Sequence, residues 1–190
     1  MFNSKTTTFF GSIALLSIVG LVGYLLYKNN KPKPQKNVLL LGGLDNRSGD
    51  LKLSDQQELL QQGLGTKYNV SSFRYNDISS LIENIEQSMA PMFIVLFSAG
   101  CKYSTKVATI MNDKGFDLSN LYVVEAYGSS DRTKSSVKGA VDLGVPSKNV
   151  LVGKYKSAGM GIVENATPTP ECSPGHWCSL TEVGKIIQQK

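Results

Sequence analysis

The chain has 190 residues and a mass of 20.6 kDa, and 41% of the residues are hydrophobic against 18% that are charged. These proportions suit one globular domain and exclude a disordered or collagen-like chain. The three cysteines, Cys101, Cys172 and Cys178, are too few and too unevenly spread for a disulfide-held miniature fold. We therefore expect packing to hold the fold.

The positive charge is concentrated at the start of the chain. The formal net charge is +5, and residues 1–36 contain five lysines and no acidic residue. In residues 37–190, fifteen Lys and Arg residues are matched by fifteen Asp and Glu residues. A protein that neutralises phosphates carries its basic excess in the folded part, so we expect no nucleic-acid partner.

Residues 9–27 form a run of nineteen residues without a charge, preceded by an N-terminal flank at 1–8. At ~1.5 Å per residue, a helix of this length approaches the ~30 Å hydrocarbon core of a bilayer. The run is longer than the usual apolar part of a signal peptide, and no A-x-A-like cleavage site follows it. It predicts one N-terminal transmembrane helix rather than a cleaved signal peptide or a buried core helix.

Residues 28–36 follow as a basic tether with prolines at 32 and 34, which disfavour helix and central strand. Lysines are more numerous on this side of the apolar run than before it, where only Lys5 stands. The positive-inside rule therefore predicts a single-pass membrane protein whose C-terminal domain, residues 37–190, lies in the cytoplasm.

The domain alternates short apolar runs with segments of helical spacing. This alternation predicts an α/β fold with a mostly parallel sheet of five strands, or slightly more, and helices on both faces. We expect Ser54 and Asp77 to cap the first two helices. The expected strands are 38–42, 68–75, 92–97, 121–127 and 149–153, and the expected helices are 54–65, 77–89, 102–113, 132–144 and 179–190.

The sequence Leu96-Phe97-Ser98-Ala99-Gly100 connects the most apolar strand to a helix. Ligands of parallel sheets bind beyond the carboxyl ends of the strands. A serine at such a turn resembles the nucleophile elbow G-x-S-x-G, although leucine stands at position 96 where the motif has glycine. The alternative is an ordinary turn of small residues between a strand and a helix.

This fragment resembles the α/β-hydrolase family in a degenerate form. The family places an acid and then a histidine later in the chain. Asp131 and His176, the one histidine of the sequence, occur in that order, while Glu164 and Glu171 are rival acids and Asp131 could instead cap a helix. The resemblance implies a small, lidless serine hydrolase in which Ser98 attacks a carbonyl, His176 transfers the proton and Asp131 orients the imidazole.

The same resemblance implies an oxyanion hole. Its donors would be the backbone N–H of Ala99 and a second N–H from Gly43 or Leu44, in the loop after the first strand. The expected substrate is an ester, thioester or similar acyl compound, either a small molecule or lipid-like, and no cofactor is required. We expect no cap domain, because the stretch between the fifth strand and His176 contains no obvious insertion large enough for one.

Cys172 and Cys178 flank His176, and a disulfide between them would fix the histidine in an oxidising compartment, whereas cytoplasmic cysteines stay reduced. A zinc site of these three residues lacks a fourth ligand and the usual spacing, so we expect no metal. Cys101 follows the predicted elbow and has two interpretations: a reactive thiol at a helix start, or buried packing.

The alternative function is a non-catalytic α/β module, either a degenerate hydrolase or a flavodoxin-like domain, that acts as a membrane-tethered binding protein. Leucine at position 96 favours it. A Walker A sequence and G-x-G-x-x-G are both absent from the chain, so nucleotide binding lacks its usual signature. The sequence does not identify a protein partner.

Overall fold

The computed structural model describes residues 36–45, 51–89, 92–126, 131–152, 167–168 and 177–190. All of them belong to one compact unit, Lys36–Lys190. The predicted flank at 1–8, the predicted transmembrane helix at 9–27 and all but the last residue of the predicted tether lie outside the described residues. None of the described helices is both long and apolar enough to cross a bilayer.

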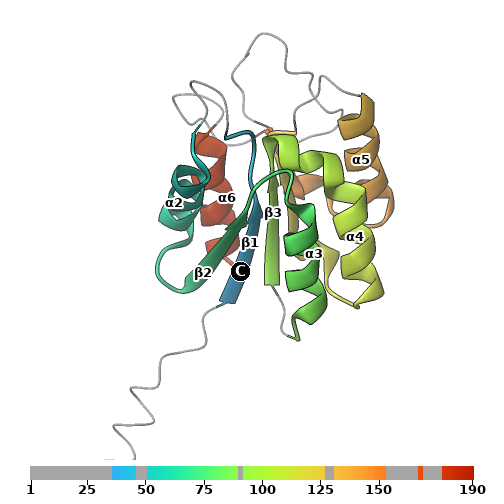
Figure 1. Ribbon diagram of the computed structural model, residues 1–190, viewed down its shortest axis with the longest axis horizontal. Helices are drawn as coiled ribbons and strands as arrows, with labels where there is room; N and C mark the ends of the chain where they lie inside the picture. The colour runs from blue at the N-terminus through green and yellow to red at the C-terminus, as the bar shows by residue number, and fades with distance from the viewer. Residues whose placement is uncertain (1–35, 46–50, 90–91, 127–130, 153–166, 169–176) are drawn as a thin grey trace, which may run out of the picture. The chain divides into compact units, whose positions relative to one another are not determined.

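The centre of the domain is a parallel sheet with the strand order β2-β1-β3-β4-β5-β6, of which Figure 1 labels β2, β1 and β3. This confirms the predicted parallel sheet, and the short β6 adds a strand that was not predicted individually. The strands are β1 (Lys36–Leu41), β2 (Tyr68–Phe73), β3 (Met92–Phe97), β4 (Leu121–Val124), β5 (Val150–Val152) and β6 (Thr167–Pro168).

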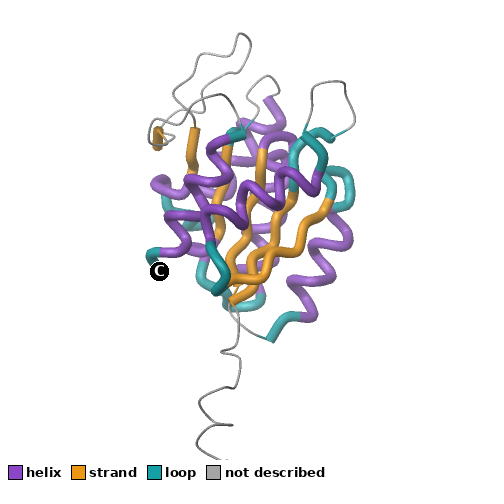
Figure 2. Tube along the Cα trace, turned by 90° about the vertical axis from the view of Figure 1, so that its left-hand side faces the viewer, coloured by secondary structure: helices purple, strands orange, loops and turns teal. Residues whose placement is uncertain are grey.

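Helices cover both faces of the sheet, as predicted, and Figure 2 shows the strands between them. One face carries α2 (Leu53–Leu64) and α6 (Cys178–Gln188), whose Leu60, Leu180 and Val183 are fully buried. The other face carries α3 (Ile78–Gln87), α4 (Ser104–Asp113) and α5 (Asp131–Asp142). The apolar stripe of each helix is buried against β-branched, leucine and aromatic residues of the sheet.

Two glycines let α2 and α6 approach closely. A Cβ on Gly63 would overlap the carbonyl of Thr181, and a Cβ on Gly184 would lie 2.6 Å from the carbonyl oxygen of Leu60. The Tyr68 hydroxyl also donates to the carbonyl of Ile187 at 3.1 Å. These contacts fix α6 on the sheet and so determine where its first residues lie.

The predicted helix at 102–113 begins two residues later, at Ser104, because a 3₁₀ helix, η1 (Ser98–Tyr103), joins β3 to α4. The predicted strand at 121–127 ends at Val124, because Glu125 has a φ of +55° and leaves the extended conformation. Both differences fall at the carboxyl ends of central strands, where the backbone turns sharply.

The predicted cap at Ser54 is wrong. The helix α2 begins at Leu53, its N-cap position is Lys52, and no side chain caps it. Asp77 does occupy the N-cap position of α3, but its carboxylate accepts from the Ser80 hydroxyl at 2.8 Å rather than from a backbone N–H of the helix.

The chain leaves β1 and β3, which are neighbours, toward opposite faces of the sheet. The helix α2 follows β1 on one face, and η1 and α4 follow β3 on the other. Such a switch point opens a crevice at the carboxyl edge, where doubly wound sheets bind ligands. The strand order thus directs attention to the loops after β1 and β3, at the top of Figure 1.

Candidate functional site

Ser98 directly follows β3 and has a left-handed backbone, with a φ of +51°. Its side chain is largely buried, with the residue only 6% exposed. A non-glycine residue in this conformation costs roughly 1–2 kcal/mol, and such strain concentrates at functional sites. The structure therefore confirms a sharp, strained turn between strand and helix at Ser98.

The loop after β1 packs directly on Ser98. A Cβ on Gly43 would lie 2.9 Å from the Ser98 Cβ and 3.2 Å from its Oγ. A Cβ on Gly100 would lie 2.7 Å from the carbonyl oxygen of Leu41. Since both positions admit only glycine without displacement, the β1 loop and the Ser98 turn interlock.

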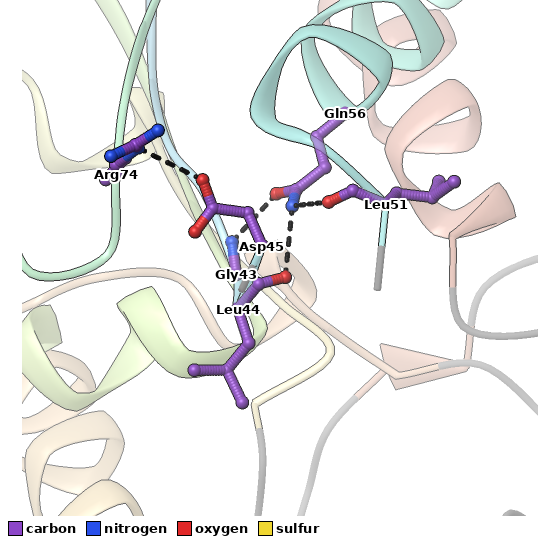
Figure 3. Close-up of polar contacts among 6 residues, drawn as sticks. All are labelled: Gly43, Leu44, Asp45, Leu51, Gln56 and Arg74. Carbon is purple, nitrogen blue, oxygen red and sulfur yellow. Dashed lines mark hydrogen bonds and ion pairs between the residues drawn. The ribbon is translucent and has the colours of Figure 1, made fainter. Parts of the chain in front are cut away.

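A buried glutamine holds the β1 loop from the side of α2 (Figure 3). Gln56 is fully buried, and its Oε1 accepts from the N–H of Gly43 at 2.8 Å. Its Nε2 donates to the carbonyls of Leu51 at 2.9 Å and Leu44 at 3.4 Å. One side-chain amide thus satisfies three backbone groups in the described parts of the loop between β1 and α2.

This network bears on the predicted oxyanion hole. The N–H of Gly43 already donates to Gln56, so Gly43 is not free to serve as a donor. Of the two predicted alternatives for the second donor, the geometry favours Leu44. Ala99, the predicted first donor, is the second residue of η1, directly after Ser98.

An ion pair ties the same loop to the end of β2. The Arg74 Nε lies 3.2 Å from the Asp45 Oδ2, and Figure 3 shows this pair beside the Gln56 network. The side chain of Asp45 is 10% exposed and that of Arg74 is 69% exposed. The N–H of Gly42 also donates to the carbonyl of Phe73 at 2.9 Å. The loop is therefore held from both sides.

The structure adds Glu125, which sequence reasoning missed. Phe97 of β3 pairs with Val124 of β4, so Ser98 and Glu125 are the next residues on adjacent strands. Glu125 is 3% exposed, and its carboxylate accepts from the Ser179 hydroxyl of α6 at 2.5 Å. The signal available in the sequence is one charged residue within the apolar run LYVVEAY, which we assigned to the strand interior.

The start of α6 lies at this edge as well. The Trp177 ring packs on Phe97, with the ring centroids 5.6 Å apart. His176, which precedes Trp177 in the sequence, lies outside the described residues. Cys178 is disulfide-bonded and Cys101 is free, and the one remaining cysteine, Cys172, also lies outside the described residues.

Asp131 occupies a different environment from Ser98 and Glu125. It is the first residue of α5 and is exposed to solvent. The predicted alternative was a cap on a helix beginning near Arg132; α5 instead includes Asp131 as its first residue, where the positive end of the helix dipole favours a carboxylate. The rival acids Glu164 and Glu171 lie outside the described residues.

Cys101 does not support the predicted interpretation of a reactive thiol. It is fully buried, and its Sγ lies 3.2 Å from the carbonyl oxygen of Leu96 and 3.4 Å from that of Val124. Burial raises the pKa of the Cys101 thiol far above its ordinary range, and the nearby Glu125 carboxylate raises it further. The structure supports the other predicted interpretation, in which Cys101 is buried packing.

A scan of the chain against protein-family models finds no matching family, and a search among curated proteins finds no match. A function must therefore be argued from the site itself. That site combines a strained, nearly buried serine, a loop that approaches it closely, and a buried carboxylate one strand away.

Proposed function

We propose that the chain is a serine hydrolase of the α/β-hydrolase type, with Ser98 as its nucleophile. The observation that carries the proposal is the left-handed backbone of Ser98, 51° in φ, at the switch point of a parallel sheet. An ordinary turn at this position would employ glycine at no steric cost. In a nucleophile elbow, by contrast, the strained turn presents the serine hydroxyl beyond the end of the strand.

The proposed reaction is acyl transfer to Ser98. The Ser98 Oγ attacks the carbonyl carbon while His176 accepts the hydroxyl proton, and the carbonyl π electrons move to the oxygen. Collapse of this oxyanion breaks the bond to the leaving alcohol or thiol, which takes the proton from His176. Water then attacks the acyl-enzyme by the same two steps and releases the acid. A carboxylate, predicted to be Asp131, keeps the imidazole in the required tautomer.

The oxyanion is proposed to form near the N–H groups of Ala99 and Leu44. The Ala99 amide belongs to the first turn of η1, where a backbone N–H has no partner within the helix. Leu44 lies in the loop that Gln56 and Asp45 hold in place. Donors that are fixed before the reaction stabilise developing charge without further reorganisation.

The proposed substrate is an ester, thioester or similar acyl compound, small or lipid-like. The chain is proposed to be membrane-anchored through residues 9–27, with the domain in the cytoplasm, because lysines follow the apolar run. The disulfide at Cys178 argues for an oxidising compartment instead. Glycosylation at the exposed Asn69, in the sequence Asn69-Val70-Ser71, would establish a lumenal domain and contradict the cytoplasmic assignment.

The test is labelling of the purified full-length chain with a fluorophosphonate probe, followed by mass spectrometry of the modified peptide. We expect one label, on Ser98, and none in Ser98→Ala. The matched control is Ser104→Ala, since Ser104 is a fully buried serine of the next helix and should not affect labelling. A folded wild-type chain that takes up no label, or equal labelling of Ser98→Ala, would contradict the proposal.

The alternative is a membrane-tethered binding module. The order β2-β1-β3-β4-β5 is that of flavodoxin-like sheets, which bind an anionic ligand between the first and third strands. In that case, inorganic phosphate should raise the melting temperature of the wild-type chain and of Ser98→Ala alike, and the serine probe should leave both unlabelled.

A further inference from the structure

We propose that Glu125, rather than Asp131, is the carboxylate that positions the general base of the Ser98 site. The inference rests on the proposed serine hydrolase and names a positioning residue of that same site. Its basis is the position of Glu125, which has a buried carboxylate and a strained backbone, at the end of the strand next to that of Ser98.

Register alone brings the two residues together. Phe97 pairs with Val124, and the next residue on each strand leaves the sheet with a left-handed backbone, at a φ of +51° for Ser98 and +55° for Glu125. Among the described residues, these are the two non-glycine residues with a positive φ. Two strained polar residues side by side at one edge indicate one functional site rather than two unrelated turns.

The surroundings of Glu125 suit a positioning role. Its N–H donates to the carbonyl of Leu151 at 2.8 Å, so the backbone is fixed to β5. Its carboxylate accepts from Ser179 in the first turn of α6, where the helix dipole favours negative charge. Because hydrogen bonds hold both the backbone and the side chain of Glu125, its carboxylate is fixed in one orientation.

The same contact ties the carboxylate to the start of α6. His176, the predicted base, precedes Ser179 by three residues in the sequence. Trp177, between them, rests on Phe97, the residue before Ser98. The start of α6 is therefore tied to both strand ends, Phe97 of β3 and Glu125 after β4.

Glu125 and Asp131 differ in their exposure to solvent: Glu125 is buried and Asp131 is exposed. Water and salt screen the field of the exposed carboxylate of Asp131, whereas a carboxylate that is 3% exposed acts through a low dielectric. An acid that stabilises an imidazolium is most effective in the second environment. Asp131 is explained by its place in the first turn of α5.

The test compares Glu125→Gln with Asp131→Asn in the full-length chain. Glutamine keeps a side-chain oxygen that can accept from Ser179 but removes the negative charge. The readout is the rate of fluorophosphonate labelling, in which a Ser98 Oγ–P bond forms, the P–F bond breaks, fluoride leaves and the serine proton passes to the base. We expect Glu125→Gln to label about 10²- to 10⁴-fold more slowly, and Asp131→Asn to label like the wild type.

The pH profile distinguishes positioning from a purely structural role. A carboxylate near an imidazole raises the imidazole pKa, so the midpoint of the labelling profile should move to lower pH in Glu125→Gln. Ser179→Ala removes the hydrogen bond but not the charge, and its midpoint should stay with the wild type. Equal midpoints in Glu125→Gln and the wild type would overturn the inference.

The remaining outcomes are also decisive. Loss of labelling in a folded Asp131→Asn overturns the inference but leaves the serine hydrolase intact, because Ser98→Ala tests that function separately. If Glu125→Gln does not fold, the acid is identified from the labelling of three other variants, Asp131→Asn, Glu164→Gln and Glu171→Gln. Normal labelling in all three supports Glu125, and loss in any one of them overturns the inference.

Discussion

The two edges of the sheet use the same backbone conformation with different residues. At the amino edge, the left-handed positions after α2, α4 and α5 are glycines, namely Gly65, Gly115 and Gly144, with φ between +69° and +116°. At the carboxyl edge, the left-handed positions after β3 and β4 are Ser98 and Glu125. Glycine adopts this conformation freely, whereas other residues lose roughly 1–2 kcal/mol. At the carboxyl edge, Ser98 and Glu125 thus occupy positions where glycine would have a less strained backbone.

The amino edge is otherwise built for packing. The rings of Tyr68 and Phe93 meet edge to face with centroids 6.1 Å apart, and Lys190 lies over Phe93 and Tyr122. Burial raises the pKa of Tyr122 to about 12, so its hydroxyl stays neutral. Buried polar side chains hold turns at both edges: Gln56, Ser98, Glu125 and Ser179 at the carboxyl edge, and Asn149, which donates to the carbonyls of Ser119 and Leu121, at the amino edge. The difference between the edges is therefore the strained backbone of Ser98 and Glu125, and it supports the proposed site at the carboxyl edge.

The largest effect is expected from Gly43→Val. Its Cβ would meet the Ser98 Cβ at 2.9 Å, so the serine must move. Displacement of a reacting group by about 1 Å costs roughly 10²-fold in rate, and overpacking lowers the free energy of unfolding by about 1–3 kcal/mol. Labelling rates and urea unfolding measure both effects. Normal labelling in Gly43→Val would show that the β1 loop does not shape the site.

The next effect is expected from Gln56→Leu. This change leaves the Gly43 N–H and two carbonyls of the loop without their buried partner. We expect the free energy of unfolding to fall by about 2–3 kcal/mol, because an unsatisfied buried polar group costs about 1–3 kcal/mol. The control is Gln62→Leu, an exposed position of the same helix, which should change stability by less than about 0.5 kcal/mol. Equal stability of the two variants would contradict the role of Gln56.

A smaller effect is expected at the amino edge from Gly115→Ala. Gly115 has a φ of +70°, and no atom of the described residues would lie within 4 Å of the added Cβ, so the cost is backbone strain alone. We expect a loss of about 1 kcal/mol in the free energy of unfolding and an unchanged labelling rate. A large loss of labelling would show that the amino edge also takes part in function.

The sequence was sufficient for the sheet and its helices, because apolar runs and helical spacing are local signals. The strand at 92–97 was predicted with the observed bounds, and the turn at Ser98 was predicted because a small residue between a strong strand and a helix is visible in the chain. The boundaries that failed lie where tertiary contacts decide, as at Glu125, whose left-handed turn ends β4 three residues early.

Gln56 shows a limit of another kind. It shares the buried stripe of α2 with Leu60 and Leu64, at a spacing of four residues, but three other glutamines of the helix give the same local pattern of polar residues. Its role depends on contacts with the loop after β1, including Gly43, which lies thirteen residues earlier in the chain. Such a partner becomes identifiable only when the fold places the loop beside the helix.

Urea unfolding of Ser98→Gly tests most directly whether the carboxyl edge keeps a strained side chain at the expense of stability. Glycine relieves roughly 1–2 kcal/mol of strain and loses about 0.5–1 kcal/mol through the greater freedom of the unfolded chain. We expect the free energy of unfolding to rise by about 0.5–1 kcal/mol, in a protein that no longer takes the serine probe. A fall of similar size would show that the Ser98 side chain stabilises the turn and would contradict the functional explanation of its strain.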